Sequence, residues 1–303
     1  LLLEHGHEVI EYTVHNDAIE RMNRLKLAAN TIWSTSHRRE LAQLIAREKP
    51  DVAHFHNTFM LISPAAYYAC RAAGVPVVQT LHNYRLLCPA ATFFRDGQPC
   101  EDCLGRFFPL PGVVHACYRD SKATSAVVAG MLATHRGLGT WRKAVSRYIV
   151  LTEFARRKFI EGGFDPAQLV IKPNFLNTDP GLGQRDGGYM VFAGRLMPEK
   201  GVLTMLAAWR DVPDIPLKII GDGPLLDTMR QQMAGGGLDH VELLGRQPRE
   251  ETLRLIQGAT SLVFPSEWYE GLPMTIVEAY ACGLPVLASR LGAMEALVVD
   301  GQT

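Results

Sequence analysis

The stretch Glu270-Gly-Leu-Pro-Met-Thr-Ile-Val-Glu278 does most to decide the fold of this 303-residue chain. It follows a short apolar run, Ser261–Pro265, which is typical of a buried strand. After Pro273 the apolar spacing becomes helical, and proline is favoured as the first residue of a helix. The pattern predicts an α/β sheet, with Glu270 on the loop after a strand and Glu278 inside the next helix.

This strand–loop–helix junction has the features of a ligand site. Open α/β sheets bind ligands outside the carboxyl ends of their strands, and the free amides of a helix start suit phosphate or sugar oxygens. Gly271 lets the backbone approach closely. Glu278 lies about 7.5 Å along the helix axis from its start, so the two carboxylates are expected to contact different parts of one long ligand. The arrangement indicates a site for a nucleotide sugar.

Length and composition limit the class of protein. Three hundred residues predict about two domains, and a hydrophobic content of 47% is ample for two cores. No apolar run approaches the roughly 20 residues of a membrane span, and no signal peptide is visible. A formal net charge of zero argues against a dedicated nucleic-acid binder. Because the chain starts Leu-Leu-Leu-Glu and stops at Thr303 in mid-pattern, we expect a fragment truncated at both ends.

The charge is unevenly distributed along the chain. From Arg119 to Glu161 there are nine Lys or Arg and three acidic residues. Two interpretations stay open. The basic residues form a solvated helix face, or they form a patch that meets an anionic membrane surface or a phosphate-bearing acceptor.

Strands and helices alternate in the first part of the chain. Strands are predicted at 7–14, 51–56, 75–81, 148–151 and 169–172, and helices at 36–48, 63–73, 121–135 and 153–161. Thr152 is placed to cap the last of these helices. A Pro-, Gly- and Cys-rich insertion at 86–118 interrupts the alternation. This part, residues 1–172, is therefore predicted to be one α/β domain.

A second alternation follows a linker. Residues 173–188 hold two prolines and four glycines and little apolar content, which is typical of a linker. Further strands are predicted at 189–193, 217–220, 241–244, 261–264 and 285–288, with helices between them. Strands that alternate with helices imply parallel sheets with helices on both faces, so 189–303 is predicted to be a second α/β domain.

The six cysteines fall into two groups. Cys70 and Cys282 lie in helical apolar patterns and are expected to be buried thiols. The other four lie in the insertion, two of them in a C-x-x-C spacing typical of metal knuckles: Cys88, Cys100, Cys103 and Cys117. These four predict a structural zinc site, with His115 as a spare ligand. Two disulfides or four unbound thiols are the alternatives. A four-thiolate zinc has no open position, so a catalytic zinc is not expected.

Two strand ends in the first domain carry histidines. His82 ends the apolar strand VPVVQTL. Alternation places His54 and His56 on one face of their strand. They suggest a metal pair, but no third ligand is evident nearby, and a role in the core or in an acceptor site is favoured.

The segments EGLPMTIVEAYACGLPV (270–286) and YMVFAGRLMPEKG (189–201) resemble one known family. Their pattern, including the Gly-Leu-Pro turn and the small-residue helix, is similar to the E-x7-E motif of retaining glycosyltransferases of family 4. The resemblance covers nearly all of the chain. It implies the GT-B fold, two Rossmann-like domains with parallel sheets facing across a cleft, in which 1–172 binds the acceptor and 189–303 binds the nucleotide sugar. The family's first strand with its Gly-rich loop and its last helix have no counterpart here.

The resemblance also implies roles for individual residues. Glu270 would lie beside the donor sugar, and Glu278 would hydrogen-bond the ribose. Arg195 and Lys200 would act as fixed cations that stabilise the diphosphate leaving group. His82 would face the donor from the first domain. The segment Gly221-Asp-Gly-Pro224 is a weak dinucleotide fingerprint, because Leu226 stands at the third glycine position. The resemblance implies instead that this segment is a turn beside the nucleotide pocket. The remaining donor-binding positions are Gly194, Gly221, Gly223, Arg246, Gly271, Leu272 and Pro273.

We therefore expect a retaining glycosyltransferase that moves a sugar from a nucleoside diphosphate donor to an acceptor hydroxyl, in polysaccharide or glycoconjugate biosynthesis. The acceptor is expected to be a carbohydrate or a lipid-linked molecule. Two fixed cations would replace a catalytic metal, so no cofactor is expected for transfer. Such an enzyme uses cytosolic donors, which implies a cytoplasmic location, either free or peripheral at the inner face of the membrane, and disfavours disulfides. The alternatives are a GT-B sugar-nucleotide epimerase and a non-catalytic nucleotide-sugar binder.

Overall fold

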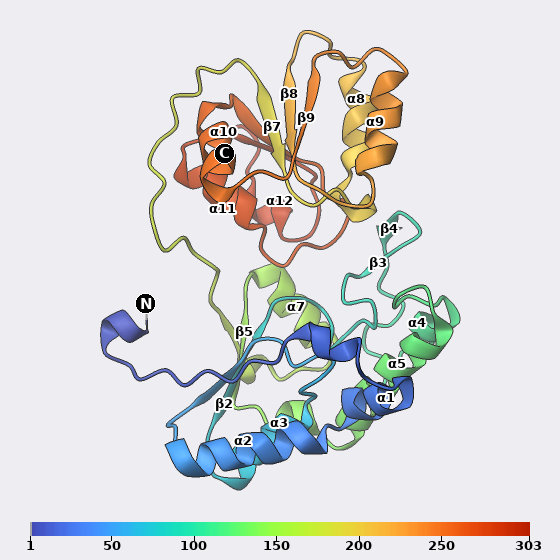
Figure 1. The fold of residues 1–303 in the computed structure, drawn as a ribbon, viewed down its shortest axis with the longest axis vertical. Coiled ribbons are helices and arrows are strands. Elements are labelled where there is room, and N and C mark those ends of the chain that lie inside the picture. Colours follow the sequence, from blue (N-terminus) through green and yellow to red (C-terminus); the bar gives the residue numbers. More distant parts are fainter. Residues whose placement is uncertain (1) are drawn as a thin grey trace. The chain divides into compact units, whose positions relative to one another are not determined.

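The computed structural model describes residues 2–303 and separates them into two compact α/β units (Figure 1). The first unit contains the chain up to Phe93 together with Cys100–Pro173. The second contains Phe94–Pro99 and Asn174–Thr303. The main division after Pro173 coincides with the start of the expected linker.

The first unit is built on a four-stranded parallel sheet in the order β1-β2-β5-β6. The strands are β1 (Ala53–Phe55), β2 (Val77–Leu81), β5 (Arg147–Val150) and β6 (Leu169–Ile171). Its helices are α1 (Arg24–Ile32), α2 (Thr35–Glu48), α3 (Ala65–Ala72), α4 (Leu110–Val114), α5 (Lys122–Gly137), α6 (Thr140–Lys143) and α7 (Glu153–Glu161). Short 3-10 turns lie at Leu3–His5, Asn16–Ile19 and Pro166–Gln168.

The strand predicted at 7–14 is wrong. These residues form no strand, and within residues 2–303 β1 pairs only with β2. The Tyr12 hydroxyl instead donates to Glu40 of α2 at 2.6 Å and contacts His37. Apolar alternation alone does not make a strand, because each strand needs a neighbour for its backbone N–H and C=O groups.

Buried polar groups tie the first unit together. The Tyr67 hydroxyl donates to the Gln79 side chain of β2 at 2.7 Å. The His135 ring of α5 is buried and stacks on Trp33, with its two nitrogens 2.8 Å from the Ile32 carbonyl and 2.9 Å from the Thr140 hydroxyl. Burial lowers the pKa of His135, so this ring is a neutral part of the core.

The insertion at 86–118 has little regular structure. It contains α4 and a two-residue hairpin of β3 (Phe94–Arg95) and β4 (Gln98–Pro99). Other elements hold it in place. Arg136 of α5 donates to the carbonyls of Leu86 and Phe107, each at 3.0 Å. Lys158 of α7 donates to Glu101 at 3.0 Å and to Glu161 at 2.9 Å. Two members of the basic 119–161 segment are therefore structural.

The second unit is a five-stranded parallel sheet in the order β11-β10-β7-β8-β9. Its strands are β7 (Met190–Ala193), β8 (Leu217–Ile220), β9 (Val241–Gly245), β10 (Ser261–Phe264) and β11 (Val286–Ala288). Its helices are α8 (Val202–Trp209), α9 (Leu226–Ala234), α10 (Arg249–Gly258), α11 (Met274–Ala281) and α12 (Met294–Leu297), with a 3-10 turn at Pro198–Lys200. All five strands lie where the sequence predicts them.

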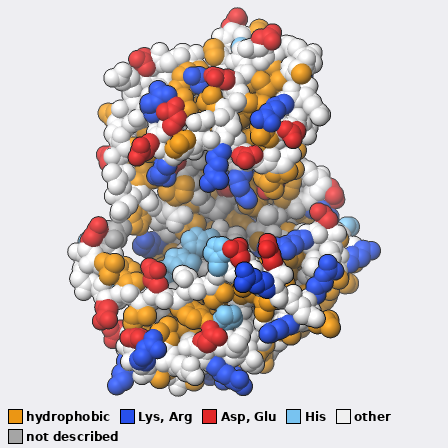
Figure 2. All heavy atoms as spheres, in the orientation of Figure 1, with side chains coloured by type: hydrophobic (Ala, Val, Ile, Leu, Met, Phe, Trp, Pro, Cys, Tyr) orange, Lys and Arg blue, Asp and Glu red, His pale blue; other side chains and the backbone are white. Residues whose placement is uncertain are grey.

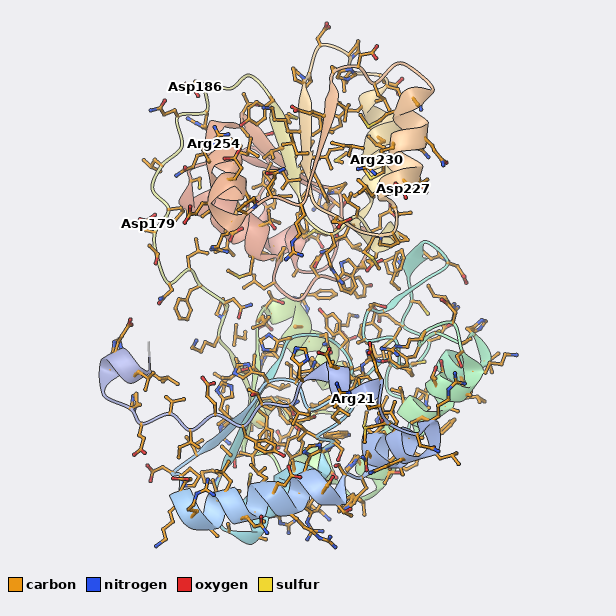
Figure 3. All side chains as sticks on the ribbon, viewed as in Figure 1. Arg21, Asp179, Asp186, Asp227, Arg230 and Arg254 are labelled. Carbon is orange, nitrogen blue, oxygen red and sulfur yellow. The ribbon has the colours of Figure 1, made fainter. Side chains whose placement is uncertain are left out.

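Two cores cover the two faces of this sheet. One core gathers residues of α10 and α11, and the other gathers residues of α8 and α9, on opposite sides of the sheet in Figure 1. Surface pairs such as Asp227 with Arg230 on α9, labelled in Figure 3, lie 3.0 Å apart but are exposed. Such pairs contribute about 0.3–0.5 kcal/mol, so the cores carry the stability of the unit.

The predicted fold class is confirmed by these two Rossmann-like units. Within the described chain, no helix combines the length and the apolar character that a bilayer crossing demands.

Candidate functional site

The strand order of the second unit creates one topological switch point, between β7 and β10. The chain runs outward from β7 to β8 and β9, then returns to place β10 on the other side of β7. Loops that leave neighbouring strands in opposite directions open a crevice at the carboxyl ends of those strands. The loops after β7 and β10 carry Arg195, Lys200 and Glu270, and α11 carries Glu278.

A cavity of about 520 Å³ lies at the carboxyl ends of β7, β8 and β9. Its lining consists of Ala193, Gly194, Arg195, Ile220, Gly221, Asp222, Arg246, Gln247, Thr252, Thr275 and Glu278. The structure therefore brings five of the predicted donor-site residues into one cavity: Gly194, Arg195, Gly221, Arg246 and Glu278.

Two glycines allow the loops around this cavity to meet. Gly221 has φ +152°, and a Cβ atom there would lie 1.8 Å from the Gly194 carbonyl oxygen. Gly223 has φ +159°, and its Cβ would lie 2.5 Å from the carbonyl oxygen of Leu196. Only glycine fits both the backbone conformation and the space. The weak fingerprint in the sequence thus marks a close approach of two backbones.

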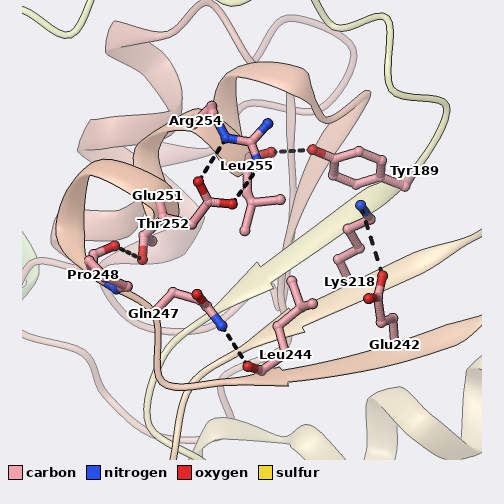
Figure 4. A network of polar contacts seen from close by, with 10 residues as sticks. All are labelled: Tyr189, Lys218, Glu242, Leu244, Gln247, Pro248, Glu251, Thr252, Arg254 and Leu255. Carbon is pink, nitrogen blue, oxygen red and sulfur yellow. Dashed lines mark hydrogen bonds and ion pairs between the residues drawn. The ribbon is translucent and has the colours of Figure 1, made fainter.

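The segment after β9 is held by its own hydrogen bonds (Figure 4). The Gln247 side chain donates to the Leu244 carbonyl at 2.7 Å, and the Thr252 hydroxyl donates to the Pro248 carbonyl at 3.0 Å. Arg254 pairs with Glu251 one turn along α10. These contacts fix where Gln247 and Thr252 enter the cavity wall, and the sequence analysis singled out neither residue.

Glu278 has an ion-pair partner that the sequence analysis missed. Its carboxylate lies 2.9 Å from Nη1 of Arg249, the first residue of α10. The Glu278 side chain is only 12% exposed, whereas the Arg249 side chain is 70% exposed. A carboxylate in apolar surroundings needs a partner, but the sequence does not show which cation supplies it, because Arg249 lies 29 positions before Glu278.

Lys200 and Glu270 form a second group beside the cavity. Lys200 Nζ donates to Glu270 Oε1 at 2.6 Å, and the Ser266 hydroxyl donates to the same oxygen at 2.6 Å. Both side chains of the ion pair are largely buried. The Lys200 ammonium also lies 5.5 Å from the ring centroids of Phe264 and Trp268. Neither Lys200 nor Glu270 lines the 520 Å³ cavity, so the structure separates them from Arg195 and Glu278.

The loop before α11 differs in detail from the prediction. Pro273 is the residue before the helix, and α11 begins at Met274. No side chain caps the start of this helix, so backbone amides of its first turn lack intrahelical acceptors. Gly271 and Leu272 lie in the preceding loop and do not line the cavity. Gly223 is also outside the lining and acts through the loop geometry described above.

The first unit has a smaller cavity, of about 250 Å³, at the carboxyl ends of β1 and β2. His82 lines it together with His56, and the Nδ1 atom of His56 lies 2.9 Å from Nε2 of His82. His54 and His56 have ring centroids 4.4 Å apart, as their shared face predicts, and His54 hydrogen-bonds the Thr80 hydroxyl at 2.8 Å. Figure 2 shows histidine side chains gathered on the face in view.

The surroundings of His54 and His82 favour the neutral forms of these two rings. Burial, followed by the neighbouring His56 ring, lowers the pKa of both His54 and His82. The hydrogen bond between His56 and His82 requires that one ring nitrogen donates and the other accepts. The pairing was not predicted, because 26 residues separate the two rings in the sequence.

The cysteines of the insertion are close enough to influence one another. Burial, with added effects of the Cys88, Cys117 and Cys100 thiols, raises the pKa of Cys103 to about 12. No disulfide joins any of the six cysteines in residues 2–303. Nor do the described residues contain a group of three or more His, Cys, Asp or Glu side chains arranged to hold a metal ion. The zinc site therefore stays a prediction, without support from this geometry.

Comparisons with known proteins extend over both units. The family model described as "Glycosyltransferase Family 4" matches residues 2–180, and that described as "Glycosyl transferases group 1" matches residues 181–303. An uncharacterized glycosyltransferase of Methanocaldococcus jannaschii, MJ1178, is 35% identical over 132 residues, 44% of this chain and 37% of that protein. A GDP-mannose-dependent phosphatidylinositol monomannoside mannosyltransferase of Mycolicibacterium smegmatis is 35% identical over 134 residues, 41% of this chain and 35% of that protein.

Solved structures share the fold. The Anabaena protein Alr3699/HepE, crystallised with UDP, superposes with a TM-score of 0.62 at 18% identity, over 87% of this chain and 66% of that chain. In each of these three comparisons the match covers less than two thirds of the other protein. One family model nevertheless matches more than half of this chain, and the second unit has the strand order and cavity described above. The chain belongs to glycosyltransferase family 4.

Proposed function

We propose that this chain forms the donor and acceptor sites of a retaining glycosyltransferase. It would move a sugar from a nucleoside diphosphate sugar to an acceptor hydroxyl, in polysaccharide or glycoconjugate biosynthesis. The observation that carries the proposal is the cavity at the carboxyl ends of β7, β8 and β9, which Arg195 and Glu278 both line. The mycobacterial relative is named for its dependence on GDP-mannose, and HepE was crystallised with UDP. The proposal therefore includes guanosine and uridine diphosphate sugars as donors.

The roles follow from the position of each group. Glu278, inside the cavity wall, accepts hydrogen bonds from the ribose hydroxyls. Arg195 supplies a guanidinium for the diphosphate, and Lys200 from the adjoining loop supplies a second cation. Lys200 forms an ion pair with Glu270. A bound diphosphate would share this ammonium with the carboxylate, while Glu270 lies beside the sugar.

The chemistry needs no covalent enzyme intermediate. The bond between the sugar anomeric carbon and the phosphate oxygen breaks as the acceptor oxygen bonds to the same face of that carbon. The acceptor proton passes to a phosphate oxygen, which leaves a nucleoside diphosphate and a glycoside of retained configuration. Glu270 already accepts hydrogen bonds from Lys200 and Ser266, which makes it a weak nucleophile. Fixed cations then stabilise the leaving group where other enzymes use a divalent metal.

The test is binding of UDP and GDP, and turnover of their sugars, by the Glu278→Gln variant. Losing a charged acceptor for two ribose hydroxyls should weaken nucleotide binding by about 10- to 150-fold. Asp227→Asn on α9 is the matched control, because it removes an exposed carboxylate of the same unit outside the cavity. Calorimetry gives the affinities, and product analysis separates transfer or hydrolysis from epimerisation and from simple binding. Unchanged affinity in Glu278→Gln would refute the site.

We further propose that the chain makes peripheral contact with an anionic membrane surface at the inner face of the membrane. Support comes from the α4 patch, which we define as the exposed apolar side chains Phe107, Phe108, Leu110 and Val114. Exposed basic residues flank it in the sequence: Arg106, Arg119 and Lys122. Apolar side chains with basic neighbours are typical of surfaces that bind anionic lipid.

A further inference from the structure

Arg85, in the first unit, has a half-buried charge with little protein to balance it. Its Cζ atom lies 4.4 Å from the centroid of the Phe59 ring and 4.8 Å from that of the Tyr118 ring. Its Nη1 donates to the Pro89 carbonyl. Among residues 2–303, no carboxylate forms an ion pair with Arg85, and Pro89 supplies its side chain's one acceptor.

This arrangement is unusual for a half-buried guanidinium. Burial lowers the pKa of Arg85, but arginine stays protonated in proteins, so the positive charge persists. Two aromatic faces offset part of the cost of burial. The side chain has five N–H donors, and a single carbonyl leaves most of them to a ligand or to water. A charge that is partly withdrawn from water favours a partner, and Arg85 lines a cavity that can hold one, which indicates a bound anion.

The cavity that Arg85 lines is rich in donors. Its neighbours in the 250 Å³ space include Asn57, Thr58 and Asn83, and no Asp or Glu contributes to the lining. The Oδ1 atom of Asn57 accepts the Phe59 amide at 3.2 Å, and that of Asn83 accepts the Arg85 amide at 3.0 Å. Because both amide oxygens are already used by the backbone, each Asn side chain offers its NH₂ group as a donor.

We propose that this cavity binds a phosphate ester of the acceptor, with Arg85 as the counter-charge and the two Asn side chains as further donors. A phosphate group has more oxygens than a carboxylate and so matches this set of donors better. The inference rests on the proposed function and deepens it. The acceptor of the reaction is then anionic and carries its phosphate in the first unit. The phosphate belongs either to a soluble sugar phosphate or to a lipid headgroup.

The first experiment is calorimetric titration of the chain with α-glucose 1-phosphate and with neutral methyl α-glucoside. We expect the phosphate to bind and the neutral sugar not to bind at the same concentration. Arg85→Gln should weaken phosphate binding by about tenfold or more, since it removes a charge-assisted contact. Arg71→Gln, which removes an exposed arginine of α3 outside the cavity, should leave it unchanged.

A second variant tests the same site in case Arg85→Gln does not fold. Asn83→Asp keeps the oxygen that accepts the Arg85 amide but replaces the NH₂ donor with a negative charge. It should abolish phosphate binding while the far-ultraviolet circular dichroism spectrum stays that of the wild type. Binding to vesicles of phosphatidic acid, compared with binding to vesicles of phosphatidylcholine, tests whether the phosphate belongs to a lipid. Weaker vesicle binding in Asn83→Asp than in the wild type identifies a lipid phosphate, because the α4 patch is the same in both, and loss only of α-glucose 1-phosphate binding identifies a soluble one.

UDP binding separates this inference from the proposed function. The 520 Å³ cavity belongs to the second unit, so Arg85→Gln should bind UDP as the wild type does. If the wild type binds UDP but neither phosphate probe, or if both variants bind the phosphate as tightly as the wild type, the anion site is refuted and the donor site stands. If UDP fails to bind while the phosphate binds, the donor assignment fails instead.

Discussion

At the scale of single residues, the ion pair of Lys200 and Glu270 changes how site variants must be read. Both side chains are largely buried and lie 2.6 Å apart. The sequence identifies both residues, but it does not show that they contact each other, because 70 positions separate them. Removing Lys200 deprives the buried Glu270 carboxylate of this ion pair, so a loss of activity would mix lost chemistry with lost stability.

We predict that Lys200→Met lowers the free energy of unfolding by about 3–5 kcal/mol, the usual cost of breaking a buried ion pair. The double variant Lys200→Met with Glu270→Gln should recover most of this loss, because no buried charge stays unpaired. Arg195→Met is the control, because it also removes a positive charge of the site. Arg195 is exposed, so this substitution should change the free energy of unfolding by less than about 0.5 kcal/mol. Urea denaturation measures all three. Equal stability of Lys200→Met and the wild type would show that the pair is not formed in solution.

At the scale of elements, the sequence predicted most of the fold for a simple physical reason. Strands of a parallel sheet are buried on both faces, and β7, β8 and β10 are largely apolar, with Lys218 and Ser261 as their polar residues. The Thr152 cap also needed only local information, and its hydroxyl accepts the Ala155 amide at 3.2 Å. Prediction failed where contacts are distant in sequence, as in the strand expected at 7–14.

The junction of the loops after β7 and β8 gives an element-scale prediction. Gly221→Ala should destabilise the second unit by more than about 2 kcal/mol, because strain at a positive φ adds to a backbone clash. The Cβ atom would meet the Gly194 carbonyl oxygen at 1.8 Å. Gly236→Ala is the matched control, since it has φ +88° but nothing within 4 Å of its Cβ. It should cost about 1–2 kcal/mol from strain alone. Thermal unfolding compares the two variants. Similar decreases in their melting temperatures would show that the loops after β7 and β8 do not approach each other closely.

At the scale of the whole molecule, sequence similarity and structure divide the chain at nearly the same place. The two family models meet between residues 180 and 181, and the compact units separate after Pro173. Each unit presents a polar cavity at the carboxyl ends of its own parallel strands. This common geometry was predictable from the strand–helix alternation. The identity of the cavity walls was not, because residues such as Arg85 and Thr252 carry no local sign that they line a cavity.

The α4 patch gives the prediction that concerns the molecule and its surroundings. Phe107 and Phe108 are 62% and 41% exposed, and inserting both rings into a lipid interface should contribute about 3 kcal/mol in total. Phe107→Ser with Phe108→Ser should therefore lower binding to vesicles of phosphatidylglycerol about 100-fold. Wild-type binding should also weaken as salt rises from about 0.05 to 0.5 M, because basic side chains contribute through screened charges.

Leu182→Ser controls for the loss of exposed apolar surface. Leu182 is 83% exposed but lies in the linker segment, far along the sequence from α4. Its substitution should leave vesicle sedimentation and UDP affinity unchanged, whereas the double Phe variant should lose only sedimentation, since the α4 patch lies outside the donor cavity. Equal sedimentation of both variants would mean that the α4 patch does not meet the membrane. The basic residues between 119 and 161 would then be a solvated surface.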